Sequence, residues 1–477
     1  MFAPGMNTIK KHPLVQSVGL IILLICFLQC GIQGCANIIA PMGGDRDSIP
    51  PVLVVAKPFD SSRNFNGKKI SLTFNEYIQL ENVTEQLIVS PTPKLPPTID
   101  SKLKVLNITI KDTLEENTTY RYNFGNAIKD VNEGNIMKDF TYIFTTGNTL
   151  DSGSIKGKII LAETGKTDST LLAILYTNAD DSAVYKEKPR YITRVNRDGI
   201  FQFENLPSKT FWLYALKDES GMRKYLSYKQ IFGFYDRPLR VGDSMPNILL
   251  YAYSMKDTTP VKTPKAVAAK PVVDKKLKFE TNLNGTEQDL LENLVIRFKQ
   301  APLKFYDSTK IRFVDDQKKE IPQIFLKLDS SRSQLTLQYP WEENKQYQLI
   351  IDTAFAIDTL GRKLMKMDTL QFHTRKQSSY GLVKLRFREL DLKKQPVLLL
   401  LSGDKIVKTH VFTSNIFEAK LFEPGEYEMR ILYDTNKNGI WDPGNFFGKH
   451  IQPEIVQPIQ RKLNVKANWD NEIDINL

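Results

Sequence analysis

The sequence predicts an all-β chain of tandem antiparallel β-sandwiches, duplicated in the order A-B-linker-A-B. Short runs in which apolar and polar residues alternate recur along the chain, as in Lys69–Phe74 and Tyr120–Phe124, and a period of two is typical of a half-buried strand. Turn sequences such as Asn66-Gly67 separate these runs. A segment rich in Pro, Lys and Ala then divides the chain into two halves with repeated motifs.

Residues 1–34 have the pattern of a secretion signal. Basic residues precede the apolar run Leu20–Leu28, which is too short to span a bilayer comfortably. In the following Ile32-Gln33-Gly34-Cys35, an apolar residue at minus three and a small residue at minus one precede a cysteine. This segment resembles the lipobox of bacterial lipoproteins, which implies cleavage before Cys35 and lipidation of its thiol. The alternative is a simple secretory signal with an incidental cysteine.

Composition agrees with export. All three cysteines lie in the first 35 residues, so that only Cys35 remains after cleavage and the mature chain has no disulfide. Residues 35–49 are predicted to be a tether, because they are rich in Gly and Pro and lack alternation. The net charge of +11 comes from Lys and Arg that are interspersed with Asp and Glu. We therefore expect a basic solvated surface and no nucleic-acid partner.

Residues 50–148 are the first predicted sandwich, with strand-like runs at the spacing of an antiparallel sandwich. Its motifs resemble those of the bacterial Ig-like domain first known from S-layer proteins, in which the motif Tyr packs inside the sandwich and an Asp-containing loop turns the chain before the last strand. The motifs that carry this resemblance are Pro50-Pro51, Phe74-Asn75-Glu76, Leu114–Tyr120, Ala127–Asp130 and Phe140–Thr146.

Residues 150–253 are predicted to be a second, different sandwich. Asp198-Gly199 reads as a hairpin turn, and Phe201, Phe203 and Leu206 then alternate with polar residues up to Pro207. This run resembles the signature of transthyretin-like or carboxypeptidase-regulatory-like domains. That resemblance implies a small scaffold without a catalytic centre of its own.

After a predicted linker at residues 254–276, the second half repeats the first, with a second Ig-like sandwich at 277–376 and a second transthyretin-like sandwich at 379–477. The second Ig-like segment lacks the leading Pro-Pro and has Gln300 where the first has an acidic residue. The motifs Phe298–Pro302, Trp341–Tyr347 and Ala356-Ile357-Asp358 are expected in the places of Phe74–Ile78, Leu114–Tyr120 and Ala127-Ile128-Lys129.

One loop has the spacing of a calcium site. Oxygen donors stand at positions one, three, five and nine of an EF-hand-type loop, with Gly439 at six. Position twelve lacks the bidentate Glu, and a strand precedes the loop. The alternative is an Asn-Gly turn whose side chains bond to turn amides. The candidate ligands are Asp434, Asn436, Asn438, the Ile440 carbonyl and Asp442.

The tripeptide Asp-Ser/Thr-apolar or Thr recurs more often than the one or two occurrences that roughly average usage would give. It resembles the O-glycosylation acceptor of exported Bacteroidota proteins, and ordinary Asp-Ser/Thr turn chemistry is the alternative. The candidate hydroxyls are those of Ser48, Thr113, Ser169, Ser182, Ser244, Thr258, Ser308, Thr353, Thr359 and Thr369.

No catalytic signature accompanies these motifs: the sequence has no G-x-S-x-G elbow, P-loop or dinucleotide fingerprint. We expect no enzymatic activity and no cofactor apart from structural calcium. The lipobox and the recurring tripeptide favour a Bacteroidota outer-membrane lipoprotein that is anchored through its lipid and binds an envelope protein, as an accessory part of an assembly or secretion complex. The periplasmic and cell-surface sides both stay open. A surface glycan-binding or adhesion protein is the alternative function, although the aromatics fall at inward positions that are typical of core residues.

Overall fold

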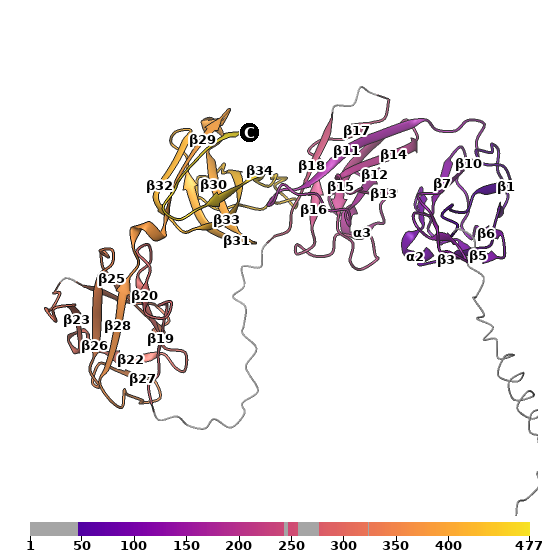
Figure 1. Ribbon diagram of the computed structural model, residues 1–477. Coiled ribbons are helices and arrows are strands. Elements are labelled where there is room, and N and C mark those ends of the chain that lie inside the picture. Colours follow the sequence, from indigo (N-terminus) through magenta and orange to yellow (C-terminus); the bar gives the residue numbers. More distant parts are fainter. Residues whose placement is uncertain (1–45, 243–246, 256–275, 323) are drawn as a thin grey trace, which may run out of the picture.

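The computed structural model describes residues 46–242, 247–255, 276–322 and 324–477. The predicted leader, Cys35 and nearly all of the predicted linker lie outside these residues. Strands dominate the described chain, and its few helices are one turn long (Figure 1). The predicted all-β class of tandem sandwiches is confirmed. Among the described helices, none has the length and apolar character needed to cross a membrane.

We name the four sandwiches A1 (residues 50–148), B1 (150–253), A2 (277–376) and B2 (379–477). A1 contains the sheets β1-β2-β6-β5, β10-β7-β4 and β3-β8-β9. Its elements are β1 (Leu53–Lys57), β2 (Lys69–Phe74), β3 (Ile78–Leu80), α2 (Val83–Gln86), β4 (Ile88–Ser90), β5 (Thr98–Lys102), β6 (Val105–Thr109), β7 (Thr119–Asn123), β8 (Ile128–Asp130), β9 (Ile136–Met137) and β10 (Thr141–Thr145).

B1 packs the sheet β14-β11-β18 against the sheet β13-β12-β15-β16, and β17 also pairs with β15. Its elements are β11 (Gly153–Leu161), β12 (Leu172–Tyr176), α3 (Ala183–Lys186), β13 (Tyr191–Arg194), β14 (Ile200–Leu206), β15 (Thr210–Leu216), β16 (Phe232–Phe234), β17 (Leu239–Arg240) and β18 (Ile248–Ala252).

A2 contains the sheets β19-β21-β25-β24, β20-β28-β26-β23 and β22-β27. Its elements are β19 (Glu280–Thr281), β20 (Glu287–Gln288), β21 (Leu294–Arg297), β22 (Leu303–Tyr306), η1 (Ser308–Lys310), β23 (Ile311–Asp315), β24 (Phe325–Leu328), β25 (Gln334–Gln338), β26 (Gln346–Ile351), β27 (Ala356–Asp358) and β28 (Asp368–Thr374), and η2 (Gln377–Ser379) leads into B2.

B2 packs the sheet β32-β29-β35 against the sheet β31-β30-β33-β34. Its elements are β29 (Gly381–Arg388), η3 (Leu392–Lys394), β30 (Pro396–Ser402), β31 (Lys405–Val411), β32 (Ile416–Phe422), β33 (Gly425–Tyr433), β34 (Ile455–Val465) and β35 (Asp470–Asn476).

The strand orders of B1 and B2 correspond, and those of A1 and A2 correspond apart from β9 in A1 and β20 in A2, which is the duplication that the repeated motifs predict. One expectation needs correction: the pairing is not antiparallel throughout. The first and last strands pair in parallel in both B units, β11 with β18 and β29 with β35. A parallel pair joins the two ends of a unit, and strand periodicity does not reveal which strands are partners.

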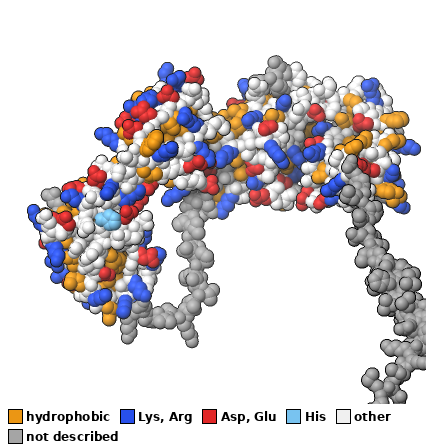
Figure 2. Space-filling model, viewed as in Figure 1, with side chains coloured by type: hydrophobic (Ala, Val, Ile, Leu, Met, Phe, Trp, Pro, Cys, Tyr) orange, Lys and Arg blue, Asp and Glu red, His pale blue; other side chains and the backbone are white. Residues whose placement is uncertain are grey.

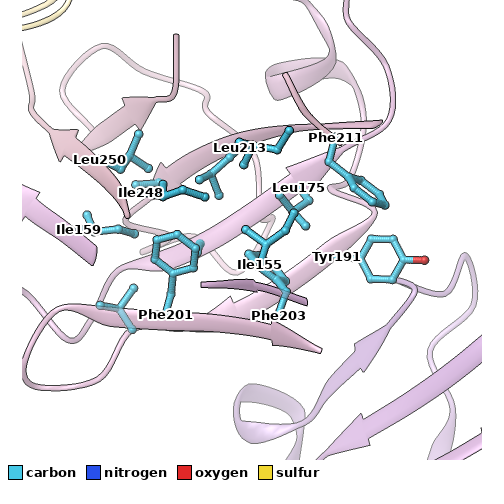
Figure 3. Packing of buried hydrophobic residues seen from close by; sticks show 14 of the residues in the cluster. Ile155, Ile159, Leu175, Tyr191, Phe201, Phe203, Phe211, Leu213, Ile248 and Leu250 are labelled. Carbon is cyan, nitrogen blue, oxygen red and sulfur yellow. The ribbon is translucent and has the colours of Figure 1, made fainter. Parts of the chain in front are cut away.

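The alternation in β14 explains the core of B1. Phe201 and Phe203 point inward while Gln202 and Glu204 are exposed. The two rings share one apolar cluster with Ile155 of the neighbouring strand β11 and with Leu175 and Leu213 of the facing sheet (Figure 3). A Cβ at Gly157 would lie 2.6 Å from the Phe201 ring, so only glycine lets that ring approach β11. Such close packing contributes about 1.5 to 3 kcal/mol for each large side chain.

In space the units follow the order A1, B1, B2, A2, which differs from their order in the chain (Figure 1). The two B units touch each other, although the residues of A2 lie between them in the sequence. The A units therefore occupy the two ends of the arrangement.

Candidate binding surface at the junction of the two B units

The segment between β33 and β34 is held by two buried carboxylates. Asp434 is 1% exposed and accepts hydrogen bonds from the backbone N–H of Lys437 and Gly439, both at 2.7 Å. Glu454 is buried as well and accepts from the backbone N–H of Thr435 at 2.7 Å and of Asp442 at 3.1 Å. The two carboxylates thus satisfy turn amides that would otherwise stay unpaired.

The structure brings the predicted calcium ligands together in this loop and pairs them with one another. The side-chain amides of Asn436 and Asn438 each donate to Asp442 Oδ2 at 2.6 Å. Ile440 contributes its backbone N–H, which donates to Asn438 Oδ1 at 2.8 Å. These are the contacts of the alternative interpretation, a hydrogen-bonded turn. Within the described ranges, no group of three or more His, Cys, Asp or Glu residues could hold a metal ion.

Calcium binding by this loop stays a prediction with a direct test. Calcium is expected to raise the melting temperature of the wild type, because the ion would bind the folded loop through five oxygen atoms, in place of the amide groups that these oxygens now contact. Asp434→Ala is expected to abolish that rise and to lower stability in chelator by about 2 kcal/mol, since the backbone N–H groups of Lys437 and Gly439 lose their buried acceptor. Exposed Asp404→Ala is the control. Identical melting in calcium and in chelator would contradict the calcium interpretation and leave the turn.

Most of the candidate glycosylation hydroxyls that the structure describes lie at the surface, while that of Ser182 is partly buried. Ser244 and Thr258 lie outside the described residues. Turn chemistry accounts for several of the tripeptides, because the aspartate accepts the backbone N–H two residues on. This occurs at Asp47, Asp168, Asp307, Asp352 and Asp358. Glycan attachment at the hydroxyls stays a prediction.

Beyond the turn, the same segment carries Phe446 into B1. The Phe446 ring is buried against the outer face of the B1 sheet, with centroid distances of 5.6 Å to Tyr214 and 5.2 Å to both Phe232 and Phe234. The backbones of the two units also pair directly, because the Val456 N–H donates to the Ala162 carbonyl at 2.9 Å. The two B units are therefore joined by an apolar plug and by backbone hydrogen bonding.

Close backbone approach fixes the other side of this junction. Gly165 has a φ of +67°, and a Cβ there would lie 2.2 Å from Pro458 Cδ in B2. Nearby, His450 Nε2 lies 2.8 Å from Asp181 Oδ2, and the Gln452 side-chain amide donates to the Phe234 carbonyl at 3.0 Å. The junction thus requires a glycine in B1 and a specific loop in B2.

An aromatic groove of about 540 Å³ opens beside the Phe446 plug. The Phe447 ring lies 5.8 Å from the Tyr225 ring and 5.9 Å from the Tyr185 ring. Tyr228 and Phe447 are 50% and 45% exposed, so the groove presents aromatic faces to solvent. Its apolar lining comprises Tyr185, Tyr225, Leu226, Tyr228, Tyr253, Met255, Phe446 and Phe447.

Sequence reasoning missed this groove, because we interpreted the aromatics as core residues at inward positions. That interpretation is correct for Tyr225 and Phe446, which are buried, and wrong for Tyr228 and Phe447, which are exposed. Tyr225, Tyr228, Phe446 and Phe447 stand in the long β15–β16 and β33–β34 connections, where no alternation assigns them a face. The sequence signal that could have indicated the groove is the presence of paired aromatic residues in a long connection between strands.

The junction between A1 and B1 is polar by comparison. Arg190 of B1 donates to Glu115 of A1 at 2.7 Å, and this hydrogen bond lowers the pKa of the Glu115 carboxyl. Arg121 of A1 pairs with Glu204 of B1 at 3.0 Å, and Arg194 donates to the Gln86 carbonyl. Paired arginines on both sides fix the angle between the two units more than they add stability.

Two buried aspartates turn the chain at equivalent places in the A units. Asp130 accepts from the backbone N–H of Glu133, Gly134 and Asn135 at 2.6, 2.9 and 2.7 Å. Asp358 accepts from Leu360 N and Arg362 N, both at 2.9 Å. Because β8 ends at Asp130 and β27 at Asp358, Asp358 corresponds to Asp130. The sequence alignment that set it against Lys129 was wrong by one residue.

Tyr120, the tyrosine of the Leu114–Tyr120 motif in A1, is buried as the resemblance implies. Its hydroxyl oxygen accepts a hydrogen bond from the Glu115 N–H at 2.8 Å. Residues 47–146 match the bacterial Ig-like domain family. This match covers A1 and supports the Ig-like resemblance there. The search of curated proteins found no match to the chain.

Several solved structures of bacterial surface proteins are similar at low identity. The Bacillus anthracis TIE protein is 12% identical over 92% of this chain and 76% of its own, with a TM-score of 0.17. The Bacillus cereus major pilin subunit BcpA is 8% identical over 68% of this chain and 99% of its own, also with a TM-score of 0.17. The S-layer protein SbsC is 11% identical over 88% of this chain and 41% of its own, with a TM-score of 0.15.

Proposed function

We propose that this chain is a non-catalytic envelope lipoprotein, anchored in the outer membrane through Cys35, that acts as a binding scaffold in an assembly or secretion complex. The observation that carries the proposal is the junction of the B units. Phe446 and the contacts around it join two sandwiches that are distant in the sequence, and the same loop builds an exposed aromatic groove. A scaffold needs domains held in a fixed relative orientation and an exposed surface that a partner can bind.

The family match supports the same interpretation for A1. Bacterial Ig-like sandwiches supply rigid modules whose loops and edges contact partners, and no step of that role needs a catalytic group. Tandem modules held at fixed angles also bind with a raised effective concentration, so that weak contacts add up. The partner is expected to be an envelope protein that buries an apolar segment in the groove.

The anchor is tested by Cys35→Ser. Diacylglycerol on the thiol and an acyl chain on the new amino terminus contribute about 0.8 kcal/mol for each buried methylene, and two or more chains make attachment stable. We expect the wild type in the outer-membrane fraction and Cys35→Ser in the soluble fraction or uncleaved at the inner membrane. An unchanged outer-membrane location of the variant would contradict lipid anchoring.

The groove is tested by photo-crosslinking in cells. A benzophenone side chain at Tyr228 is expected to capture an outer-membrane protein, and the same group at exposed Phe325 in A2 is the control. Phe447→Ala should weaken capture about tenfold, because aromatic interface residues often cost more than 1 kcal/mol when truncated. Capture of no protein from position 228 would contradict the scaffold proposal.

A surface glycan-binding role is the second candidate, favoured by the same exposed rings. Sugars stack on aromatic faces such as those of Tyr185, Tyr228 and Phe447, which line one groove. Retention of the purified chain on outer-membrane polysaccharide, and its loss in Tyr228→Ala, would favour this role over the scaffold.

A further inference from the structure

One end of A1 exposes an apolar cluster at the place where the described chain begins. Figure 2 shows apolar side chains gathered on this unit beside that point. The six residues of this A1 end cluster are 40% to 65% exposed. They are Ile49, Val52, Tyr77, Leu103, Val131 and Ile136.

Hydrogen bonds show that these residues share one end of the sandwich. The Val131 N–H donates to the Tyr77 carbonyl at 3.1 Å, and the Ile78 N–H donates to the Leu103 carbonyl at 3.0 Å. The Asn135 side-chain amide donates to the Ile49 carbonyl at 3.3 Å. The A1 end cluster is therefore a contiguous surface built from the β3–β8–β9 sheet, the β5–β6 turn and the segment before β1.

Leu103 is the most exposed residue of the cluster and the least expected one. It occupies the turn between β5 and β6 with a φ of +55°, a backbone conformation that glycine and asparagine adopt at lower cost. A leucine there is 65% exposed and adds little to the core. Its side chain gains stability only if something outside the domain covers it.

The distance to the predicted lipidation site identifies what can cover this end. Arg46 donates to the Glu133 carbonyl at 3.0 Å, so the chain joins A1 beside Val131 and Ile136. Cys35 is eleven residues before Arg46. An extended chain spans at most about 3.6 Å per residue, so this end stays within about 40 Å of the lipidated sulfur.

We propose that the A1 end cluster docks onto the lipid bilayer that holds Cys35, with Leu103 inserted at the headgroup boundary and Tyr77 at the interface. This inference rests on the proposed anchoring. Tyrosine suits the interface because its ring is apolar and its hydroxyl stays hydrated. Lys104 lies 5.6 Å from the centre of the Tyr77 ring and supplies a cation at headgroup level.

The charges at this end indicate an apolar contact instead of attraction to anionic lipid. The carboxylates Asp47, Glu76 and Glu133 flank the cluster, and burial together with the nearby acidic groups raises the pKa of Glu76. These carboxylates offset the cations Arg46 and Lys104 at the same end, so the cluster has no net attraction to anionic headgroups. Docking should therefore persist at high salt and on zwitterionic phosphatidylcholine, unlike binding by a basic patch.

The chain is suited to a site-specific test, because Cys35 is its only mature cysteine and is expected to be acylated. An environment-sensitive fluorophore is attached to Leu103→Cys in the full lipidated protein, reconstituted in phosphatidylcholine vesicles that contain a lipid-linked quencher. Leu95→Cys is the matched control: this leucine is 55% exposed and lies before β5, at the far end of the β5–β6 hairpin. We expect strong quenching at position 103 and little at position 95.

A second variant guards against local disturbance by the label. With the fluorophore at Val131→Cys, Leu103→Asp is expected to reduce the docked population about tenfold, since burying one leucine contributes on the order of that factor. Vesicle-bound protein with equally weak quenching at positions 103 and 95 would overturn docking and leave anchoring intact. Failure of the wild type to bind vesicles would overturn both.

Discussion

Phe446→Ala is expected to separate B1 from B2 and to cost about 3 kcal/mol of the free energy of unfolding. The Phe446 ring is 4% exposed and lies among Tyr214, Phe232 and Phe234 of B1. Truncation leaves a cavity between two units, which can relax by moving apart. Thermal unfolding should then show separate transitions where the wild type unfolds as one, and small-angle scattering should show a larger radius of gyration.

Two further variants test whether this separation is specific to the junction of B1 and B2. Gly165→Val acts on the same junction from the B1 side, because its side chain would collide with Pro458, and it should produce the same separation. Phe325→Ala removes a phenyl group that is 60% exposed and should leave both measurements unchanged. If Phe446→Ala kept the wild-type radius and a single transition, the B units would not depend on this plug.

Asp130→Ala is expected to destabilise A1 by about 3 kcal/mol at neutral pH, because three partly buried hydrogen bonds from backbone N–H groups lose their charged acceptor. Asp358→Ala should act in the same way on A2. Chemical unfolding of the full chain, followed by probes in each unit, measures both effects. Asp100 is exposed in the neighbouring strand β5, and Asp100→Ala should change stability by less than about 0.5 kcal/mol.

The effect of Asp130→Ala should also depend on pH. Burial by itself raises the pKa of Asp130, but hydrogen bonds from the backbone N–H of Gly134, Glu133, Asn135 and Asn132 outweigh it and hold the pKa below the ordinary value. A lowered folded-state pKa contributes stability above the unfolded pKa of about 3.9, and this is lost as the pH falls through the folded value. The difference between wild type and variant should therefore shrink only below about pH 4. A constant difference down to pH 2 would contradict this role.

The fold could be predicted because apolar and polar residues alternate locally along its strands. Ile70, Leu72 and Phe74 predicted the buried face of β2, and Phe201 and Phe203 predicted that of β14. Repeated motifs also predicted the duplication, since equivalent strands need equivalent apolar faces. The parallel partners β11 and β18 were missed because pairing between the ends of a unit leaves no local pattern.

The candidate site was predicted only in part. The spacing of Asp434, Asn436 and Asn438 identified an ordered loop, because alternate oxygen side chains fold back on turn amides whether or not an ion is present. The role of the same loop at the junction could not be read from that spacing. Phe446 binds a face of B1 that is about 200 residues away in the chain, and only the folded arrangement brings them together.

The spatial order A1, B1, B2, A2 changes what a shortened protein would be. B2 follows A2 in the sequence but lies in the interior of the row, so removing residues 379–477 would delete a central unit and keep A2, a terminal one (Figure 1). A2 would then be connected to B1 only through residues 254–276, and it would lose the ion pair that its Arg375 forms with Glu423 of B2. The contacts of B2 with B1 on one side and with A2 on the other therefore make B2 the link between A2 and the rest of the row.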